Sequence, residues 1–217
     1  MLEELRNKVM ETAKAMSAAG LAHGAEGNVS ARDPATGLIA ITGSQIPYDV
    51  ITPDDIVIVK SDGERVWGSI KPSSETPMHT YLYRNRVEVG AIMHTHSEYA
   101  IAASIAHCTI PPITFPIALY IGSAIIAVDW TDPGTEEMGS KPHAAMLAAN
   151  ARAALLANHG ALILDEDLDG ALESAKAVEE GARMYMLARS FGEPIPISSD
   201  RVEFFYNMWH NLKAGVK

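Results

Sequence analysis

Apolar residues recur at helical spacing where the chain begins. Leu2, Leu5, Val9 and Met16 follow one another at intervals of three, four and seven positions, which places their side chains on one face of a helix. Gly20 comes next, and glycine commonly ends a helix because it readily adopts the left-handed backbone conformation. The pattern predicts an amphipathic helix that ends at Gly20.

Short runs rich in valine and isoleucine predict strands. Residues 38–42, 55–63 and 89–94 are such runs, and Gly, Pro or Asp bounds them. Residues 123–130 and 152–160 have the same character. The sequence therefore predicts a sheet that contains these five strands, whose order and direction do not follow from the pattern.

Longer periodic segments predict helices that alternate with the strands. Thr76 followed by Pro77 is a favourable N-cap and first-turn pair, so one helix is expected to begin there. Residues 134–150 and 168–191 predict two more helices, and a terminal helix is expected from about Ser199.

Length and composition limit the class of protein. A chain of 217 residues suits one domain with a substantial core, and its apolar fraction of 47% and charged fraction of 20% are typical of a soluble globular protein. No internal repeat or long linker interrupts it. We therefore expect a single α/β domain over residues 1–217, with helices on both faces of a central sheet.

The charge of the chain limits its partners. The net charge is −10, the isoelectric point is near 5.2, and no dense run of lysine and arginine occurs. Such a surface is not expected to bind nucleic acid, because binding requires neutralisation of phosphates. An anionic substrate must then be held locally, by a metal ion, a helix N-terminus or backbone amides.

Two further features concern the compartment. The N-terminal segment mixes both charges with its apolar residues, and no apolar run is long enough to span a bilayer. We therefore expect a cytoplasmic protein with no membrane partner. The single cysteine, Cys108, cannot form an internal disulfide, and its apolar surroundings predict a buried and unreactive thiol.

Two histidines stand at the end of the predicted strand 89–94. In a strand, His94 and His96 point to the same face, an arrangement that suits one metal ion or a hydrogen-bonded histidine pair. His159 ends another apolar run, and three neutral imidazoles with an open fourth position are a common catalytic zinc site. The third histidine therefore favours metal binding. The remaining histidines are expected at the surface or in packing: His23, His79, His107, His143 and His210.

Four motifs occur in the order found in a known family. They are GNVSAR, KPSSETPMH, VGAIMHTHSEYA and ALLANHGALI. Together they resemble the class II aldolase and adducin-head family, which includes fuculose-1-phosphate aldolases and ribulose-5-phosphate 4-epimerases. The resemblance covers nearly the whole chain and weakens after about Phe191. It implies a three-layer α/β/α domain, usually a four-fold homotetramer with active sites at subunit interfaces.

The resemblance implies roles for the histidines and for one glutamate. His94, His96 and His159 would bind Zn²⁺, or another divalent ion such as Mn²⁺ or Co²⁺, and Glu75 would be the catalytic acid/base. Cleaving a carbon–carbon bond near a carbonyl leaves an enediolate, whose negative charge a metal ion stabilises while a carboxylate moves the proton. The implied reaction is reversible cleavage of a small ketose phosphate, of the fuculose-1-phosphate type, to dihydroxyacetone phosphate and an aldehyde.

The resemblance also implies a pocket for the substrate phosphate. Gly27 and Asn28, together with Ser73 and Ser74, match this pocket, and Ser44 stands where the aldolases have threonine. Amides and hydroxyls close to a helix N-terminus could hold a phosphate without lysine. This arrangement meets the constraint that the acidic chain imposes.

Several positions depart from the aldolase pattern. Gln45 replaces a glycine of the phosphate pocket, and Glu26 puts a negative charge where a small residue is usual. Phe115 stands where a tyrosine proton donor is expected, with Tyr120 or a water molecule as candidate substitutes. The C-terminal segment lacks the tyrosine that closes the site in the aldolases. The substrate, and whether it is phosphorylated, therefore stay open.

Other activities share the same metal site. Epimerases of the family carry aspartate where this chain has Glu75, and an additional aspartate within residues 113–120 that is absent here. Cleavage is therefore favoured over epimerisation, while dehydration and decarboxylation stay open. A non-catalytic interaction domain like the adducin head would not need the three histidines and Glu75, so an enzyme is favoured.

Overall fold

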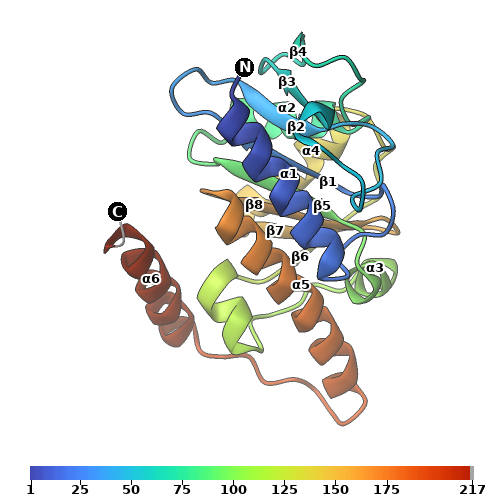
Figure 1. Ribbon diagram of the computed structural model, residues 1–217. Coiled ribbons are helices and arrows are strands. Elements are labelled where there is room, and N and C mark those ends of the chain that lie inside the picture. Colours follow the sequence, from blue (N-terminus) through green and yellow to red (C-terminus); the bar gives the residue numbers. More distant parts are fainter. Residues whose placement is uncertain (216–217) are drawn as a thin grey trace.

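An eight-stranded sheet forms the centre of the described chain (Figure 1). The computed structural model describes residues 1–215. The strands are β1 (Asn28–Arg32), β2 (Ile39–Thr42), β3 (Ile56–Val59), β4 (Arg65–Trp67), β5 (Ala91–Thr95), β6 (Ile126–Val128), β7 (Ala153–Leu156) and β8 (Gly160–Asp165). Their order is β4-β3-β2-β1-β5-β8-β7-β6, and neighbours are antiparallel except β6 and β7, which are parallel.

Helices cover both faces of this sheet. They are α1 (Glu3–Ala18), α2 (Thr76–Asn85), α3 (Glu98–Ile105), α4 (Glu137–Ala148), α5 (Leu168–Arg189) and α6 (Ser199–Gly215), with a short 3₁₀ helix, η1 (Pro53–Asp55). Helix α5 contacts both α1 and α3 in one layer, whereas α2 contacts α4 in the other (Figure 1). The predicted three-layer α/β/α fold is confirmed.

The sheet divides the apolar core into two parts, as β2 illustrates. Ile39 and Ile41 belong to the cluster beneath α2 and α4, whereas Ala40 belongs to the cluster beneath α1 and α5. All three side chains are fully buried. Strands covered on both faces read as continuous apolar runs, and this is why several of them could be found from the sequence.

Most predicted strands are present in shorter form. Residues 38–42, 55–63 and 123–130 contain β2, β3 and β6, and β5 begins within residues 89–94 and ends one residue beyond them, at Thr95. The predicted strand 152–160 is correct only in its first part, which forms β7.

The pattern of the sequence does not predict β1, β4, β8 or α3. Polar residues, among them Asn28 and Ser30, interrupt β1, so it lacks a run of valine and isoleucine. β8 begins at Gly160, the last residue of the predicted strand 152–160, and α3 has only 8 residues. Short or polar elements carry too weak a periodic signal to be separated from their neighbours.

Helix α2 begins one residue earlier than predicted. The sequence favoured Thr76 as the N-cap residue, whereas Thr76 is already the first residue of the helix. The N-cap position falls on Glu75, whose side chain makes no capping hydrogen bond. Instead, the Thr76 hydroxyl donates to the Ser73 carbonyl oxygen at 2.7 Å, and the Glu75 N–H donates to the Ser73 hydroxyl oxygen at 3.2 Å. The Glu75 carboxylate is therefore available for contacts with the sheet.

Helix α6 lies beside the main body and not against the sheet (Figure 1). It packs on η2, a π-helical turn over Ile117–Ile121. Two aromatic pairs join these parts: Phe115 with Phe205, whose ring centroids are 5.0 Å apart, and Tyr120 with Trp209, at 4.9 Å. Aromatic edge contacts thus hold the end of the described chain in place.

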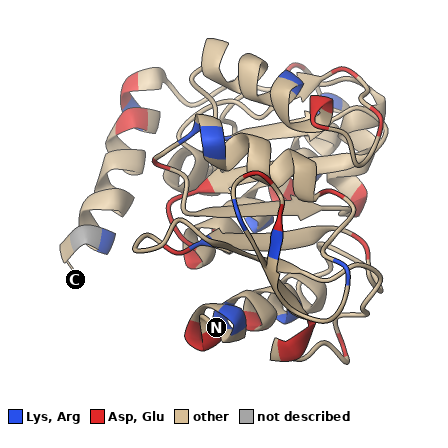
Figure 2. Cartoon of the chain, turned by 90° about the horizontal axis from the view of Figure 1, so that it is seen from above, with Lys and Arg blue, Asp and Glu red and all other residues tan. Residues whose placement is uncertain are grey.

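The distribution of charged residues agrees with the acidic composition, whereas the position of the cysteine differs from the prediction. Figure 2 shows lysine and arginine scattered among more numerous aspartate and glutamate, 17 against 27 in the sequence. Among the helices of residues 1–215, none is long and apolar enough to cross a membrane. The expected burial of Cys108 is wrong, because it lies half-buried in an exposed turn after α3.

Candidate active site

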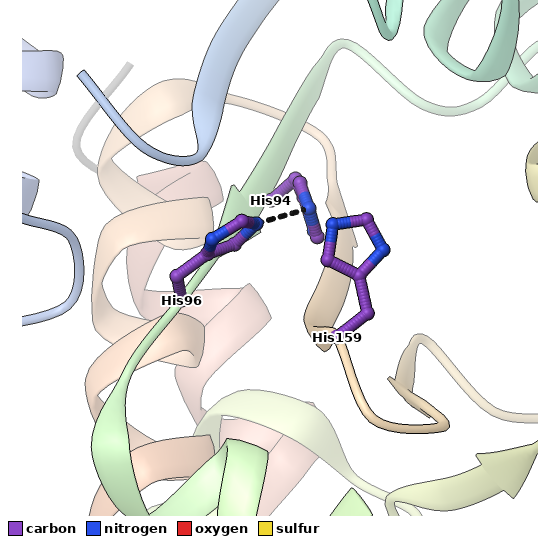
Figure 3. Close-up of side chains that lie close together, drawn as sticks. All are labelled: His94, His96 and His159. Carbon is purple, nitrogen blue, oxygen red and sulfur yellow. Dashed lines mark hydrogen bonds between the residues drawn. The ribbon is translucent and has the colours of Figure 1, made fainter. Parts of the chain in front are cut away.

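Three imidazole rings meet in the middle of the sheet, at the end of β5 (Figure 3). His94 lies in β5, His96 just after it, and His159 in the turn between β7 and β8. Ring centroids are 4.8 to 4.9 Å apart in each pair, and one nitrogen of each ring lies within 4.8 Å of the others. The side chain of His94 is fully buried, whereas those of His96 and His159 are 20% and 12% exposed. The cluster is therefore closed behind His94 and open on the opposite side.

The turn that carries His159 depends on two backbone features. Asn158 has a positive φ of 58°, a conformation that asparagine tolerates better than most residues. Gly160 lies so close to β5 that a Cβ atom would be 2.1 Å from the Thr95 carbonyl oxygen. The predicted strand over residues 152–160 is thus replaced by a strand and a tight turn, which brings His159 to the other histidines.

A backbone hydrogen bond fixes the tautomer of His94. Its Nδ1 lies 2.9 Å from the Ala161 carbonyl oxygen, and a carbonyl only accepts, so Nδ1 carries the proton and Nε2 the lone pair. Nε2 of His96 is 2.9 Å from this Nε2 (Figure 3). Two ring nitrogens therefore converge on a point that a proton or a cation can occupy.

Burial keeps the three imidazoles neutral. Desolvation lowers the pKa of His94 to about 4. Desolvation, assisted by the neighbouring His94 and His159, lowers the pKa of His96 to about 3. The pKa of His159 is lowered to about 4, again by desolvation first and by His94 second. Neutral imidazoles with converging nitrogens are the form that binds a divalent metal ion, so this donor set fits one.

The carboxylate of Glu75 lies beside the three rings. Its Oε2 is 3.3 Å from Nε2 of His94, and its Oε1 is 3.4 Å from Nε2 of His159. The amide of Asn28 donates to Oε2 at 2.7 Å. The Glu75 side chain is only 9% exposed. A carboxylate in this position can approach a cation held by the histidines or exchange a proton with a molecule bound next to it.

Strand β1 lies directly against β5 at the site. Asn28 is the register partner of His94. Gly27, the residue before it, has a φ of 68°, and a Cβ atom there would be 2.5 Å from the His94 carbonyl oxygen, so glycine is required at this position. The Asn28 side chain is buried and turns toward Glu75 and His79, with its Oδ1 2.5 Å from Nε2 of His79.

The three serines assigned to the phosphate pocket lie on neighbouring segments. The N–H of Ser44 donates to the Lys71 carbonyl oxygen at 2.9 Å, and the N–H of Ser73 donates to the Thr42 carbonyl oxygen at 3.0 Å. Ser73 is buried, whereas Ser74 is exposed. Ser73 and Ser74 therefore border the N-terminus of α2, next to Glu75 in the chain, and Ser44 lies on the segment hydrogen-bonded to Lys71.

Two departures from the aldolase pattern lie near these groups. Oε2 of Glu26 is 3.8 Å from Nδ1 of His96, on the ring edge opposite to the nitrogen that points at His94. Gln45 is exposed and has a positive φ of 61°, which strains any residue with a Cβ atom. Glu26 thus faces a candidate ligand that burial keeps neutral, and Gln45 occupies a position suited to glycine.

The residues considered as proton donors lie elsewhere in this chain. Phe115 is half-exposed and packs against Phe205. Tyr120 packs edge-on against Trp209. The ring contacts of both residues in the described structure are with α6, so neither is brought to Glu75.

Two residues near the site were not singled out from the sequence. His79 is fully buried, as packing predicts, yet both of its ring nitrogens are hydrogen-bonded, to Asn28 and to Ser30. The half-exposed indole of Trp130 lies 6.5 Å from the His159 ring. His79 follows Glu75 by four positions, the spacing of neighbours on one helix face. This spacing was the one feature of the sequence that could have linked His79 to the site.

Comparisons with known proteins decide the family. The sequence profile of the Class II Aldolase and Adducin N-terminal domain family matches residues 7–186. The chain belongs to this family. A 5-deoxy-D-ribulose 1-phosphate aldolase of Bacillus thuringiensis serovar kurstaki is 33% identical over 203 residues, 94% of each chain. An L-fuculose phosphate aldolase of Escherichia coli (strain K12) is 34% identical over 197 residues, 91% of this chain and 89% of the relative.

A solved structure agrees with this family assignment. An L-fuculose 1-phosphate aldolase superposes with a TM-score of 0.88 at 32% identity, covering 97% of this chain and 96% of the other. The relatives named here are aldolases, so the prediction of a class II aldolase enzyme is confirmed. Class II aldolases depend on a metal ion and act on sugar phosphates, and the three histidines offer a possible metal site.

Proposed function

We propose that the protein is a zinc-dependent aldolase that reversibly cleaves a small ketose 1-phosphate to dihydroxyacetone phosphate and an aldehyde. One observation carries the proposal. The Glu75 carboxylate lies 3.3 Å from Nε2 of His94 and 3.4 Å from Nε2 of His159, so a single acid/base group adjoins the candidate metal ligands. Relatives named for L-fuculose phosphate and 5-deoxy-D-ribulose 1-phosphate support this substrate class.

The candidate metal ligands are His94, His96 and His159. Zinc is the preferred ion, with Mn²⁺ and Co²⁺ as alternatives, because three neutral imidazoles with an open position are the usual catalytic zinc set. When bound, the ion would stabilise the negative charge that develops beside the substrate carbonyl. The protein supplies neutral, oriented ligands and leaves the side opposite His94 open to the substrate.

Glu75 moves the proton in this proposal. Cleavage breaks the bond between the α and β carbons of the ketone, the β-hydroxyl loses its proton to water, and the β carbon becomes the aldehyde. The electron pair of the broken bond passes to the α carbon, giving an enediolate. Protonated Glu75 then delivers its proton to the α carbon, which releases dihydroxyacetone phosphate, and the proton that the β-hydroxyl gave to water restores protonated Glu75. In the condensation direction Glu75 takes the proton from the α carbon. Water is proposed at the hydroxyl because Phe115 has no proton to exchange.

The phosphate would be held by backbone and hydroxyl groups. Ser73 and Ser74 directly precede α2, whose helix dipole favours an anion at its N-terminus. Ser44 lies on the neighbouring segment. Asn28 keeps one N–H after it donates the other to the carboxylate, and Gly27 permits the backbone to approach closely.

A homotetramer with sites at subunit interfaces is part of the proposal. Phe204, Met208 and Leu212 are 55%, 36% and 60% exposed and recur every fourth residue along α6. An exposed apolar stripe of this kind commonly marks an interface. The expected cytoplasmic location is kept, because a charged sugar phosphate does not cross a bilayer unaided.

The test combines metal content with exchange of a carbon-bound hydrogen. Dihydroxyacetone phosphate is incubated with the protein in deuterated water, before and after chelation and after readdition of zinc, with Glu75→Gln as the control. Exchange that needs both metal and Glu75 supports the proposal. Bound metal without exchange overturns the choice of substrate in favour of a dehydratase or decarboxylase, and absence of bound metal overturns the metal-dependent mechanism.

A further inference from the structure

We propose that His79 is a positioning residue that, acting through Asn28, orients the Glu75 carboxylate so that Oε1 is the oxygen that exchanges the proton. This inference rests on the proposed function, in which Glu75 is the acid/base. It extends that function to a set of buried residues on β1 and α2 that lie behind Glu75, away from the open side of the site.

An unbroken series of hydrogen bonds leads from the core to Glu75. The Tyr83 hydroxyl lies 2.9 Å from the Ser30 hydroxyl, which lies 2.6 Å from Nδ1 of His79. Nε2 of His79 lies 2.5 Å from Oδ1 of Asn28, whose Nδ2 lies 2.7 Å from Oε2 of Glu75. The four residues behind Glu75 are at most 3% exposed. Solvent therefore does not compete with these bonds, and each buried group depends on its protein partner.

Chemistry fixes the direction of every bond in this series. An ionised carboxylate only accepts, so Asn28 presents its N–H to Glu75 and its carbonyl oxygen to His79. Nε2 of His79 must then carry the ring proton, and Nδ1 must accept from the Ser30 hydroxyl. The Ser30 oxygen is left to accept from Tyr83. A reversal at any point would place two acceptors or two donors face to face inside the core, at considerable cost.

The direction gives the two oxygens of Glu75 different roles. Oε2 accepts from Asn28. Oε1 accepts no hydrogen bond from the residues that the structure describes, and it lies toward His159, which is partly exposed. Oε1 is therefore the oxygen that is free to take up a proton and to deliver it to a bound molecule.

The orientation of Asn28 depends on His79. The two ends of an asparagine amide have nearly the same shape, so packing alone does not distinguish them. Without the donor at Nε2 of His79, the amide could turn over and place its carbonyl oxygen against Oε2 of Glu75, where two acceptors repel. Burial also lowers the pKa of His79 to about 3, so the ring stays neutral and keeps one donor and one acceptor.

A pair of variants at His79 separates positioning from packing. His79→Gln keeps an N–H for Asn28 and an oxygen for Ser30, whereas His79→Leu fills the space without a polar atom. For His79→Leu we expect kcat to fall by about tenfold to a hundredfold, as small misplacement of a catalytic group typically causes. Metal content is expected to stay within about twofold of the wild type, and His79→Gln to recover most of kcat.

Two outcomes would overturn the role of His79. Wild-type kcat in His79→Leu would show that the orientation of Glu75 does not depend on this ring. An equal loss of kcat in both variants, at equal melting temperature and equal metal content, would reduce His79 to a packing residue.

The tautomer of His79 gives a readout that needs neither a variant nor a substrate. Nitrogen-15 NMR of the wild-type protein is expected to show the ring proton on Nε2 and a lone pair on Nδ1, and the opposite tautomer would overturn the proposal even where variants fail to fold. A wild-type protein without metal-dependent exchange of dihydroxyacetone phosphate would instead refute the proposed function. The two failures are therefore distinguishable.

Discussion

The carboxylate of Glu26 faces Nδ1 of His96 across 3.8 Å, behind the ring as seen from His94. A carboxylate behind a ligand histidine holds the ring in place and makes its other nitrogen a better donor to a metal. We therefore expect Glu26→Gln to weaken zinc binding by about tenfold. The dissociation constant is measured by competition with a chelator of known affinity.

Glu98→Gln is the matched control for this substitution. Glu98 is exposed, follows His96 by two positions and has no ion-pair partner among the described residues. Its replacement changes the net charge equally and is expected to leave the zinc affinity unchanged. Equal weakening in both variants would assign the effect to overall charge and not to the contact between Glu26 and His96.

Replacement of Glu75 by glutamine should separate proton transfer from metal binding. The amide oxygen can still accept from Asn28, but the side chain has no proton to exchange. We expect kcat to fall by at least about a hundredfold, while metal content stays close to that of the wild type. Turnover and elemental analysis on the same preparation check both parts, and unchanged turnover would remove Glu75 from the mechanism.

Loss of His94 should empty the metal site. His94 is fully buried and its tautomer is fixed by the Ala161 carbonyl oxygen, so alanine removes an oriented ligand without a substitute. We expect the metal bound after purification to fall to less than about a tenth of the wild-type amount. His107→Ala, at an exposed histidine that pairs with Asp129, should retain the metal; full occupancy in His94→Ala would contradict its assignment as a ligand.

The strained backbone at Gln45 predicts a substitution that changes binding more than stability. Glycine at φ 61° removes strain of roughly 1–2 kcal/mol but loses about 0.5–1 kcal/mol through the entropy of the unfolded chain. The free energy of unfolding in urea should therefore rise by no more than about 1.5 kcal/mol. If Gln45 obstructs the phosphate pocket, Gln45→Gly also lowers KM for a ketose phosphate, and a raised KM would show that the side chain assists binding.

Burial of His79 predicts a loss of stability in acid. Its pKa is lowered from 6.5 to about 3, so between these values the unfolded chain binds a proton that the folded chain does not. The contribution of neutral His79 to the free energy of unfolding is complete above about pH 6.5. It is lost as pH falls, at up to about 1.4 kcal/mol per pH unit. Urea unfolding at about pH 7 and about pH 5 should show a smaller decrease for His79→Gln than for the wild type, and equal decreases would contradict this assignment.

The candidate metal ligands differ in how far the sequence predicts them. His94 and His96 share a face because alternation along a strand is local and needs no tertiary information. His159 reaches them through β8, whose residue Ala161 pairs with Thr95 of β5. That pairing joins segments far apart in the chain. The sequence therefore suggested His159 as a third ligand, because it ends an apolar run, but did not predict the turn that positions it.

The buried polar residues were harder to predict because they break the local pattern. Asn28 and Ser30 make β1 look like an irregular segment, yet their polar side chains are required by hydrogen bonds to Glu75 and His79. The spacing of His79 and Glu75 indicates one helix face, but not which strand lies beneath it. Local rules fail most often where function imposes a polar residue on the core.

Two glycines close the floor of the site on both sides of β5. A Cβ atom at Gly27 or Gly160 would lie 2.5 or 2.1 Å from a backbone carbonyl oxygen of that strand. Any larger residue at Gly27 or Gly160 would push the neighbouring strands away from β5, so these two positions require glycine. Glu26 and Gln45, by contrast, are exposed beside the site and carry side chains that the aldolase pattern does not have. In chains of this kind, a change of substrate is therefore expected to alter exposed residues such as Glu26 and Gln45, while Gly27 and Gly160 stay glycine.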